Sequence, residues 1–247
     1  MAFFYHRVAA TAESPLTAPI EIFKQQVDWL RDRFELVSLE ESLHRILRGN
    51  GQPTAHITFD DGYAENCSEA LPYLIANRVP TTYFVSTWHL ITGTPFQHDV
   101  SLGKPLAVNT PQQVRAMADA GIEIGSHTRR HVDLGTITDE ATLREEIIGS
   151  KRELEDMIGR PVRYFAFPYG MARQLTAAAL RIVREAGYEA ICSAFGGYNF
   201  PGDDPFHLQR IHGDNEMCRF KNWATMDPRK IGIRHRLPTD VSEQLLV

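Results

Sequence analysis

The chain has 247 residues, a net charge of −5 and 43% apolar residues, which suits one globular domain with a sizeable core. Its interspersed charges argue against a nucleic-acid partner, and its three widely spaced cysteines argue against a disulfide framework or a cysteine-based zinc site. The N-terminus lacks a secretory-signal pattern and no apolar run reaches transmembrane length, so we expect a cytoplasmic protein.

Short apolar runs alternate with helical patterns along the chain. The predicted strands cover residues 2–5, 36–38, 55–59, 81–85, 122–124, 162–166, 189–193 and 207–211. The predicted helices cover residues 20–33, 39–48, 66–77, 110–120, 139–158 and 175–186. Between the fourth strand and the fourth helix, residues 88–108 show little periodicity and are predicted to form a long surface loop.

This alternation predicts a mostly parallel sheet, and the number of units predicts a distorted (β/α) barrel of about seven strands in a single α/β domain. We expect the barrel to span residues 1–218, with the chemistry-bearing core at about 55–212. Residues 219–247 are polar and poorly patterned, and form an extension of unknown role.

Most of the unusual polar residues stand where a predicted strand ends. In a parallel barrel, functional residues gather at the carboxyl ends of the strands. The residues in such positions include His6, Asp60, Asp61, His127, Tyr169 and His212. The sequence therefore places most of its ionisable chemistry on one rim.

Two stretches suggest a metal site. Asp60 and Asp61 follow a strand; because side chains alternate along a strand, one carboxylate is able to bind a metal while the other acts as a base. His127 and His131 are four residues apart, a spacing that places both imidazoles on one face of a helical turn. Taken singly, the first stretch also reads as an Asp-Gly turn and the second as a chance surface pair. Together they resemble a catalytic zinc site with an open coordination position.

A third stretch runs from Arg163 to a Pro168-Tyr169-Gly170 turn. The turn is able to aim a backbone N–H at a developing oxyanion, and Arg163 is a candidate to pair with Asp60 and orient it. A packed strand with a plain turn and a surface arginine is the alternative. His212 suits a general acid near the metal, and a purely structural histidine is the alternative for it and for His6.

The segment 88–108 offers aromatic residues for a sugar. Trp88, His89, Phe96 and His98 are candidates for a stacking wall, because aromatic faces cover the apolar faces of sugars. Anchoring of this segment onto the barrel is the equally weighted alternative.

Three motifs in this order resemble the polysaccharide deacetylases with the NodB-homology domain, also called the family-four carbohydrate esterases. Thr58-Phe-Asp-Asp-Gly62 is similar to their first motif, Ser126-His-Thr-Arg-Arg-His131 to their second and Arg163-Tyr-Phe-Ala-Phe-Pro-Tyr-Gly170 to their third. The family's fourth motif is not recognisable, and the fifth is loosely echoed by Gln209-Arg-Ile-His212.

The resemblance implies a metal-dependent hydrolase that removes N-acetyl groups from an amino sugar in a polysaccharide or glycan precursor. One divalent ion, Zn²⁺ before Co²⁺, Ni²⁺ or Fe²⁺, is expected on Asp61, His127 and His131. The resemblance implies Asp60 as the base, the Tyr169 backbone N–H as the oxyanion donor and Arg163 as an orienting residue, and His212 is the candidate acid.

We assign Trp88, Pro168 and His6 to contacts with the substrate. An O-acetyl esterase, a deacylase for non-sugar amides and a non-catalytic carbohydrate-binding protein remain alternatives. The carbohydrate is the only partner that we expect, and the sequence does not predict an oligomeric state.

Overall fold

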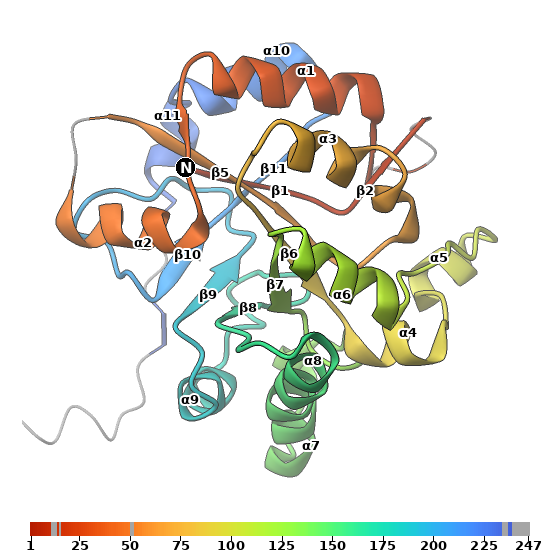
Figure 1. The fold of residues 1–247 in the computed structure, drawn as a ribbon. Helices are drawn as coiled ribbons and strands as arrows, with labels where there is room; N and C mark the ends of the chain where they lie inside the picture. The colour runs from red at the N-terminus through yellow and green to blue at the C-terminus, as the bar shows by residue number, and fades with distance from the viewer. Residues whose placement is uncertain (11–13, 15, 50–51, 234–236, 239–247) are drawn as a thin grey trace, which may run out of the picture.

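All strand pairs of the main sheet run parallel, as the alternation of strands and helices predicts. The computed structural model describes residues 1–10, 14, 16–49, 52–233 and 237–238 (Figure 1). The strand order is β10-β9-β8-β7-β6-β5-β1-β11, with β4 paired to β5, and a small separate sheet pairs β2 with β3. These strands are β1 (Ala2–Tyr5), β2 (Arg7–Ala9), β3 (Thr17–Pro19), β4 (Glu35–Leu36), β5 (Thr54–Phe59), β6 (Thr81–Val85), β7 (Glu123–Ser126), β8 (Tyr164–Ala166), β9 (Ala190–Ser193), β10 (His207–Gln209) and β11 (Ile211–His212).

The sheet closes into a barrel through one short segment of chain. β10 pairs with β9 at one end of the strand order, and β11 pairs with β1 at the other. Only Arg210 separates β10 from β11, so residues 207–212 form one extended segment that changes partners at this residue. Counted as one, this segment reduces the eight strands of the path to seven, which confirms the predicted barrel.

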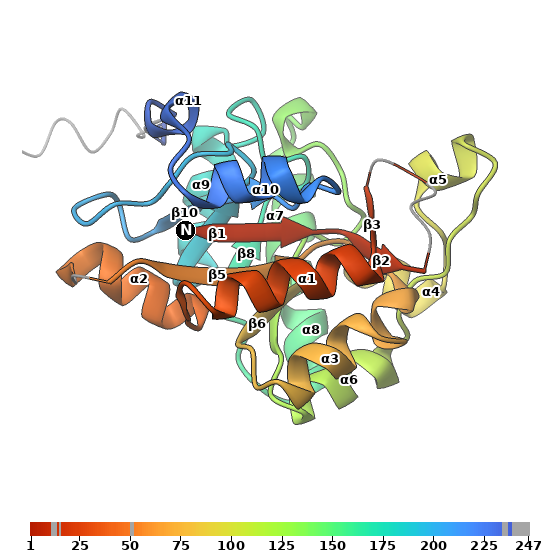
Figure 2. The same cartoon turned by 90° about the horizontal axis from the view of Figure 1, so that it is seen from above.

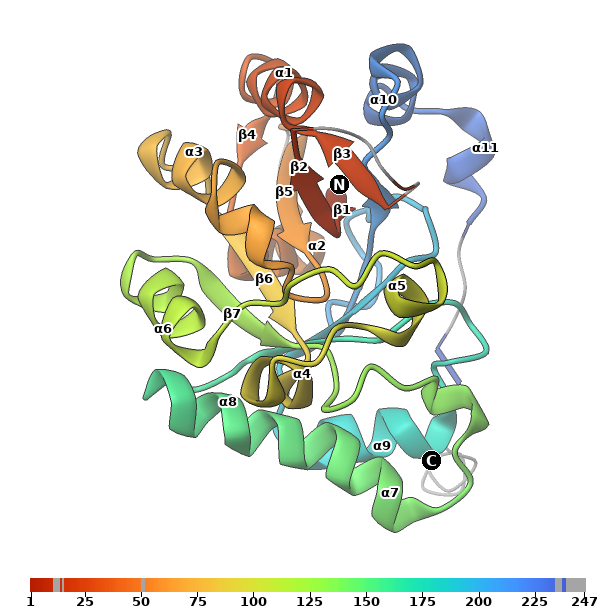
Figure 3. The same cartoon turned by 90° about the vertical axis from the view of Figure 1, so that its right-hand side faces the viewer.

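The helices form the outer layer, and several of them begin with a side-chain cap. Figure 3 shows α1, α3, α6 and α8 arranged around the strands. Ser38 caps α2 by accepting from the amide of Glu41, and Thr110 forms a reciprocal capping box with Gln113 at the start of α6. The helices are α1 (Ile20–Arg31), α2 (Leu39–Arg48), α3 (Ala70–Ala76), α4 (Thr87–Thr92), α5 (Gln97–Ser101), α6 (Pro111–Asp119), α7 (Glu140–Arg144), α8 (Ser150–Ile158), α9 (Ala177–Glu185), α10 (Met217–Ala224) and α11 (Pro228–Ile231).

Several predicted elements need correction. The predicted loop 88–108 contains α4 and α5, which are too short to show a periodic pattern in the sequence. The predicted helix 66–77 is split into a 3-10 turn, Ala64–Cys67, and α3. The predicted helix 139–158 is continuous, but α7 and α8 are joined by a π-helical turn, Glu145–Gly149.

The C-terminal part packs on the barrel beyond the predicted boundary. That boundary, after residue 218, falls inside α10. Phe220 of α10 is fully buried, with its ring 4.8 Å from that of Phe3 in β1, and Figure 2 shows α10 beside α1. The predicted extension therefore begins as part of the barrel, because this ring fills the core. Residues 234–236 and 239–247 of the extension lie outside the described residues.

Among the described residues, no helix is both long enough and apolar enough to span a membrane. The cytoplasmic location stays a prediction.

A buried histidine in the sheet predicts how stability depends on pH. His56 donates from Nδ1 to the Val37 carbonyl and accepts at Nε2 from the Thr82 hydroxyl, and burial lowers its pKa to about 4. The unfolded chain, with a histidine pKa of about 6.5, binds the proton more readily, so this stabilisation is present above pH 6.5 and is lost as the pH falls towards 4. The loss amounts to about 3 kcal/mol in the free energy of unfolding.

Denaturant unfolding at pH 7.5 and pH 4.5 checks this. His56→Gln, which cannot titrate, is expected to lose less stability between these pH values than the wild type. Replacing the exposed His44 by Gln should leave the loss of stability between these pH values as in the wild type. If His56→Gln lost as much free energy of unfolding between the two pH values as the wild type, other groups would be responsible for the loss of stability in acid.

Candidate active site

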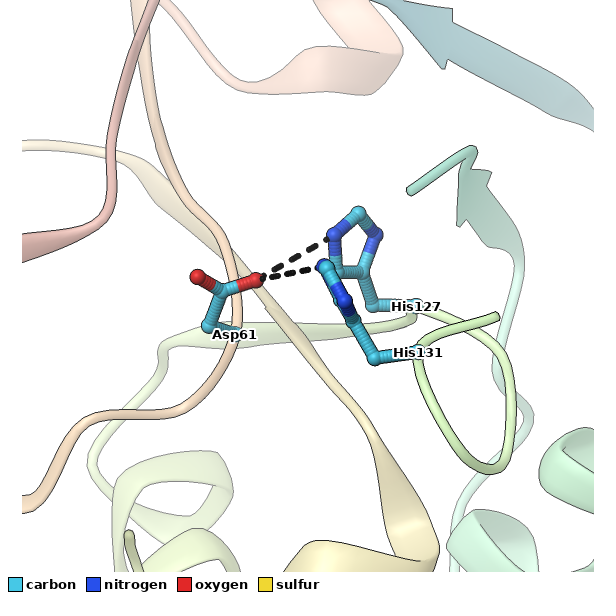
Figure 4. Close-up of side chains that lie close together, drawn as sticks. All are labelled: Asp61, His127 and His131. Carbon is cyan, nitrogen blue, oxygen red and sulfur yellow. Dashed lines mark ion pairs between the residues drawn. The ribbon is translucent and has the colours of Figure 1, made fainter. Parts of the chain in front are cut away.

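Three predicted metal ligands meet at the carboxyl ends of β5 and β7 (Figure 4). The Asp61 Oδ1 atom lies 3.4 Å from His127 Nε2 and 3.1 Å from His131 Nε2. Asp61 and His127 are each 2% exposed, whereas His131 is 11% exposed and opens the group to the surface. The ligand atoms of all three lie within 4.8 Å of one another. One ion can therefore contact all three side chains.

The hydrogen bond at Nδ1 of His127 leaves its Nε2 free to ligate a metal. Its Nδ1 lies 2.8 Å from the Ala166 carbonyl oxygen, which can only accept, so Nδ1 carries the proton. When the ring is neutral, as a metal ligand must be, its Nε2 lone pair points at Asp61 Oδ1, a buried oxygen without a hydrogen-bond partner. Without a metal, the effect of burial is outweighed by Asp60 and Asp61, which raise the pKa of His127. Two acceptors that face each other in a buried place fit a cation between them.

The two histidines do not lie on a helical turn, contrary to the prediction. Residues 127–133 form an irregular loop after β7, and Thr128 and His131 have φ angles of 64° and 55°. The His131 amide donates to the Thr128 hydroxyl at 3.0 Å, which stabilises this turn. The positive φ angles bring the ring centres of His127 and His131 to 5.1 Å of each other. A loop, and not the predicted helical turn, therefore places the two imidazoles side by side.

A buried carboxylate holds the loop between the two histidines. Glu146 is 1% exposed, and its Oε2 accepts from the backbone amides of Arg129 at 3.0 Å and Arg130 at 2.8 Å. It comes from the π-helical turn between α7 and α8. Sequence reasoning missed Glu146, because nothing in a helical pattern marks which glutamate faces a loop.

Asp60 is held by an arginine from the segment that closes the barrel. Arg210 is fully buried and donates from two nitrogens to the two carboxylate oxygens of Asp60, at 2.6 and 2.8 Å. The guanidinium also bonds Thr58 Oγ1 and the Ser193 carbonyl, and it lies over the Phe4 ring at 4.8 Å. Arg210 stands where the extended segment 207–212 changes partners, and from there it reaches into the barrel.

The predicted pairing of Arg163 with Asp60 is therefore wrong. Arg163 precedes β8, at the amino ends of the strands, and its ion pairs are with Glu123, Glu40 and Glu189. Asp60 follows β5 at the opposite ends, so a strand length separates the two. An arginine between Leu208 and Ile211 in a predicted strand was the signal in the sequence that could have identified Arg210.

Electrostatics keep both aspartates ionised. Burial alone raises the pKa of Asp61, but the imidazoles of His131 and His127 outweigh it and hold the pKa well below its usual range. Burial raises the pKa of Asp60 as well, and Arg210 together with His127 lowers it below the usual range. Asp60 is thus an anion with one side fixed on Arg210.

The third motif forms a tight turn beside His131. Tyr169 and Gly170 have φ angles of 63° and 61°, and a Cβ atom on Gly170 would lie 2.7 Å from the backbone nitrogen of Ala194. A glycine is therefore required there. The Tyr169 ring is 54% exposed, with its centre 5.4 Å from that of His131, and the structure records no acceptor for the Tyr169 amide among the described residues.

Strained backbone marks all three motifs. Six described residues other than glycine have a positive φ, and four of them are Asp61, Thr128, His131 and Tyr169. Such conformations cost energy and persist where the surrounding structure fixes them, most often at functional sites.

His6 and His212 lie together near the aspartates. Their ring centres are 5.6 Å apart, and His6 Nδ1 is buried without a hydrogen-bond partner. Burial lowers the pKa of His6, against the opposing charges of Asp61 and Asp60. Burial and then His6 lower the pKa of His212 to about 4, so this imidazole is neutral near pH 7.

The aromatic residues of segment 88–108 divide into two groups. His89 and Phe96 are buried, with ring centres 4.0 Å apart, and they anchor the segment as the structural alternative predicts. Trp88, in the first turn of α4, is half-buried, and its amide donates to the Arg129 carbonyl at 2.9 Å. Pro168 is buried in the third motif. The substrate contacts assigned to Trp88, Pro168 and His6 stay predictions.

Comparisons with known proteins agree with the three motifs. The chain is 26% identical to the protein YxkH of Bacillus subtilis (strain 168) over 188 residues. This aligned region covers 75% of this chain and 61% of that protein. It is 28% identical over 127 residues to a chitooligosaccharide deacetylase of Bradyrhizobium sp. (strain ANU 289), which covers 51% of this chain and 50% of the relative. The chain thus spans about half to three fifths of the length of these curated relatives.

The fold is shared with a solved structure, that of IcaB from Ammonifex degensii. The two are 24% identical with a TM-score of 0.74, over 90% of this chain and 93% of that one. The sequence profile of the polysaccharide deacetylases matches residues 48–191, which contain Asp60, Asp61, both histidines of the candidate metal site and the Tyr169 turn. The chain therefore belongs to the polysaccharide deacetylase family.

Proposed function

We propose that this protein is a metal-dependent hydrolase that removes N-acetyl groups from an acetylated amino sugar. The observation that carries the proposal is the convergence of Asp61, His127 and His131 on one point, with the ionised Asp60 beside Asp61 in the chain. Family membership supports the reaction class. The chitooligosaccharide deacetylase among the relatives supports an oligomer of N-acetylglucosamine as the first substrate to test.

The chain's own residues supply a base and a donor. Asp61, His127 and His131 would hold a divalent ion, which would supply Lewis acidity to polarise the acetyl carbonyl and to lower the pKa of water from about 15.7 towards about 7. Asp60 takes the proton of the attacking water on a carboxylate oxygen, while Arg210 keeps that carboxylate oriented. The Tyr169 backbone N–H donates to the carbonyl oxygen as it gains charge, a contact worth about 3 kcal/mol in similar sites.

The departing nitrogen needs a proton, because an amide nitrogen is otherwise a poor leaving group. We assign this transfer to His212, with His6 beside it. Because His212 is neutral near pH 7, it has to receive a proton before it can donate one. Cleavage of the C–N bond thus leaves a free amine on the sugar and releases acetate.

Release of free amine from tetra-N-acetylchitotetraose tests the function. The metal-free protein is loaded separately with Zn²⁺, Co²⁺, Ni²⁺ or Fe²⁺, and elemental analysis gives the ion that the purified protein carries. Acetate release from O-acetylated sugars without amine release would favour the esterase alternative. Sugar binding without turnover under any metal would favour the non-catalytic alternative.

Glu146 is expected to control metal affinity although it is not a ligand. Replacing Glu146 by Ala leaves the amides of Arg129 and Arg130 without their acceptor, so the loop between the two histidines loses its fixed geometry. Removal of groups that orient metal ligands typically costs about 10- to 100-fold in affinity. Glu146→Gln keeps an acceptor oxygen and should lose less. Competition titration with a chromogenic chelator measures both variants.

The neighbouring Glu145 provides the matched control. It is half exposed and binds the side chains of Arg129 and Arg130 but not their amides. Glu145→Ala should keep the wild-type affinity. Equal losses in Glu145→Ala and Glu146→Ala would show that charge near the loop, rather than the amide contacts, sets the affinity.

A further inference from the structure

His98 is fixed in place by groups that the proposed chemistry does not use. Its ring stacks on Phe96, with centres 5.5 Å apart and planes 19° apart, and its Nε2 lies 2.9 Å from the Tyr63 hydroxyl. Phe96 and Tyr63 are both 1% exposed, whereas the His98 side chain is 36% exposed. A polar ring that buried neighbours hold so firmly, yet that reaches the surface, is preorganised to meet a ligand.

The hydrogen bonds of Tyr63 decide which nitrogen of His98 carries the proton. The Tyr63 hydroxyl has one hydrogen, which it donates to the carboxylate of the buried Asp99 at 2.8 Å. It must therefore accept from His98, so Nε2 carries a proton, and Nδ1 is the nitrogen that is left for a ligand. The structure records no partner for Nδ1 among the described residues. His98 thus offers Nδ1 for a hydrogen bond in a fixed position.

This nitrogen belongs to a ring beside the proposed metal site. The ring centres of His98 and the ligand His131 are 6.1 Å apart, and the exposed Tyr169 ring lies 5.4 Å from His131. We propose that His98 and Tyr169 form a subsite for the pyranose ring that carries the acetamide, where His98 Nδ1 forms a hydrogen bond with a ring hydroxyl and Tyr169 covers an apolar face of the sugar. This inference rests on the proposed function, and it names a specificity residue for that site.

The test separates binding from chemistry. His98→Ala is expected to raise KM for tetra-N-acetylchitotetraose about 3- to 10-fold, the effect of one lost hydrogen bond, with kcat within about twofold of the wild type. His98→Asn, whose side-chain oxygen lies near the position of Nδ1, should raise KM less. Gln97→Ala changes an exposed neighbour on the same helix and should leave KM unchanged.

Calorimetric titration of the metal-free protein with the same oligosaccharide makes the test independent of turnover. A 3- to 10-fold weaker Kd for His98→Ala than for the wild type supports the subsite, even if no metal-loaded protein releases amine and the proposed function fails. Unchanged KM and Kd in His98→Ala would overturn the subsite and leave the function standing. A lower Tm with unchanged Kd would also overturn it, by assigning His98 a structural role alone.

Discussion

Replacing Asp60 by Asn is expected to lower kcat for deacetylation by about 100- to 10,000-fold, the usual contribution of a general base. The side chain keeps its shape, but the amide cannot take the proton of the attacking water. Asp61, His127 and His131 are unchanged, so metal content should stay at the wild-type level. Amine release from tetra-N-acetylchitotetraose, with metal measured on the same sample, tests this.

The same substitution also removes the charge partner of Arg210. The guanidinium is fully buried and makes two hydrogen bonds to the carboxylate of Asp60. An amide can accept only one of them, and breaking a buried ion pair from one side typically costs about 3–5 kcal/mol of stability. Asp60→Asn should therefore lower Tm as well as kcat.

A double variant separates the two effects. Adding Arg210→Gln to Asp60→Asn removes the uncompensated buried charge, so it should recover part of the Tm and none of the turnover. If Asp60→Asn with full metal content were as active as the wild type, Asp60 would not be the base. Recovery of turnover in the double variant would show that lost folding, not lost chemistry, inactivates Asp60→Asn.

Replacing His131 by Ala is expected to remove the metal and with it deacetylation. Two protein ligands then remain where a catalytic site of this type uses three. The affinity for the metal should fall by more than the roughly 10- to 100-fold that is typical when a residue that only orients the ligands is removed. His131 is the most exposed of the three, so this variant has the smallest folding cost. Elemental analysis and amine release measure both consequences.

Chelation gives the same result without a substitution. Wild-type protein treated with a chelator should lose turnover and regain it when the ion is restored, whereas His131→Ala should regain it only at much higher metal concentration. Replacing the exposed His44 by Ala is the control for loss of a histidine. Full activity in metal-free wild-type protein would contradict the proposed chemistry.

Local patterns in the sequence were sufficient for much of the fold. Apolar runs that are buried on both faces, such as residues 55–59 and 81–85, indicate strands of a parallel sheet, because in a barrel one face points into the interior and helices cover the other. Caps such as Ser38 and Thr110 mark where helices start. Helices shorter than two turns, such as α4 and α5, were not predicted because they are too short to show a helical period of apolar residues.

The convergence of the three candidate metal ligands was predictable from the sequence because each one follows a strand, and the carboxyl ends of parallel strands meet on one rim whatever the details of packing. The resemblance to a known family then assigned their roles. The partner of Asp60 was not predictable in this way: Arg210 is 150 positions away and reaches the carboxylate only because residues 207–212 change sheet partners at that point.

The amino-acid sequence by itself determined the parallel barrel, the three motifs and the identity of the residues that meet at Asp61. The tertiary structure decided that Arg210 and not Arg163 holds Asp60, that a loop fixed by Glu146 and not a helix presents the histidines, and that His98 faces the site. The physical reason is that pattern and propensity act over a few residues, whereas a buried charge is satisfied by whichever partner the closed barrel brings within hydrogen-bond distance.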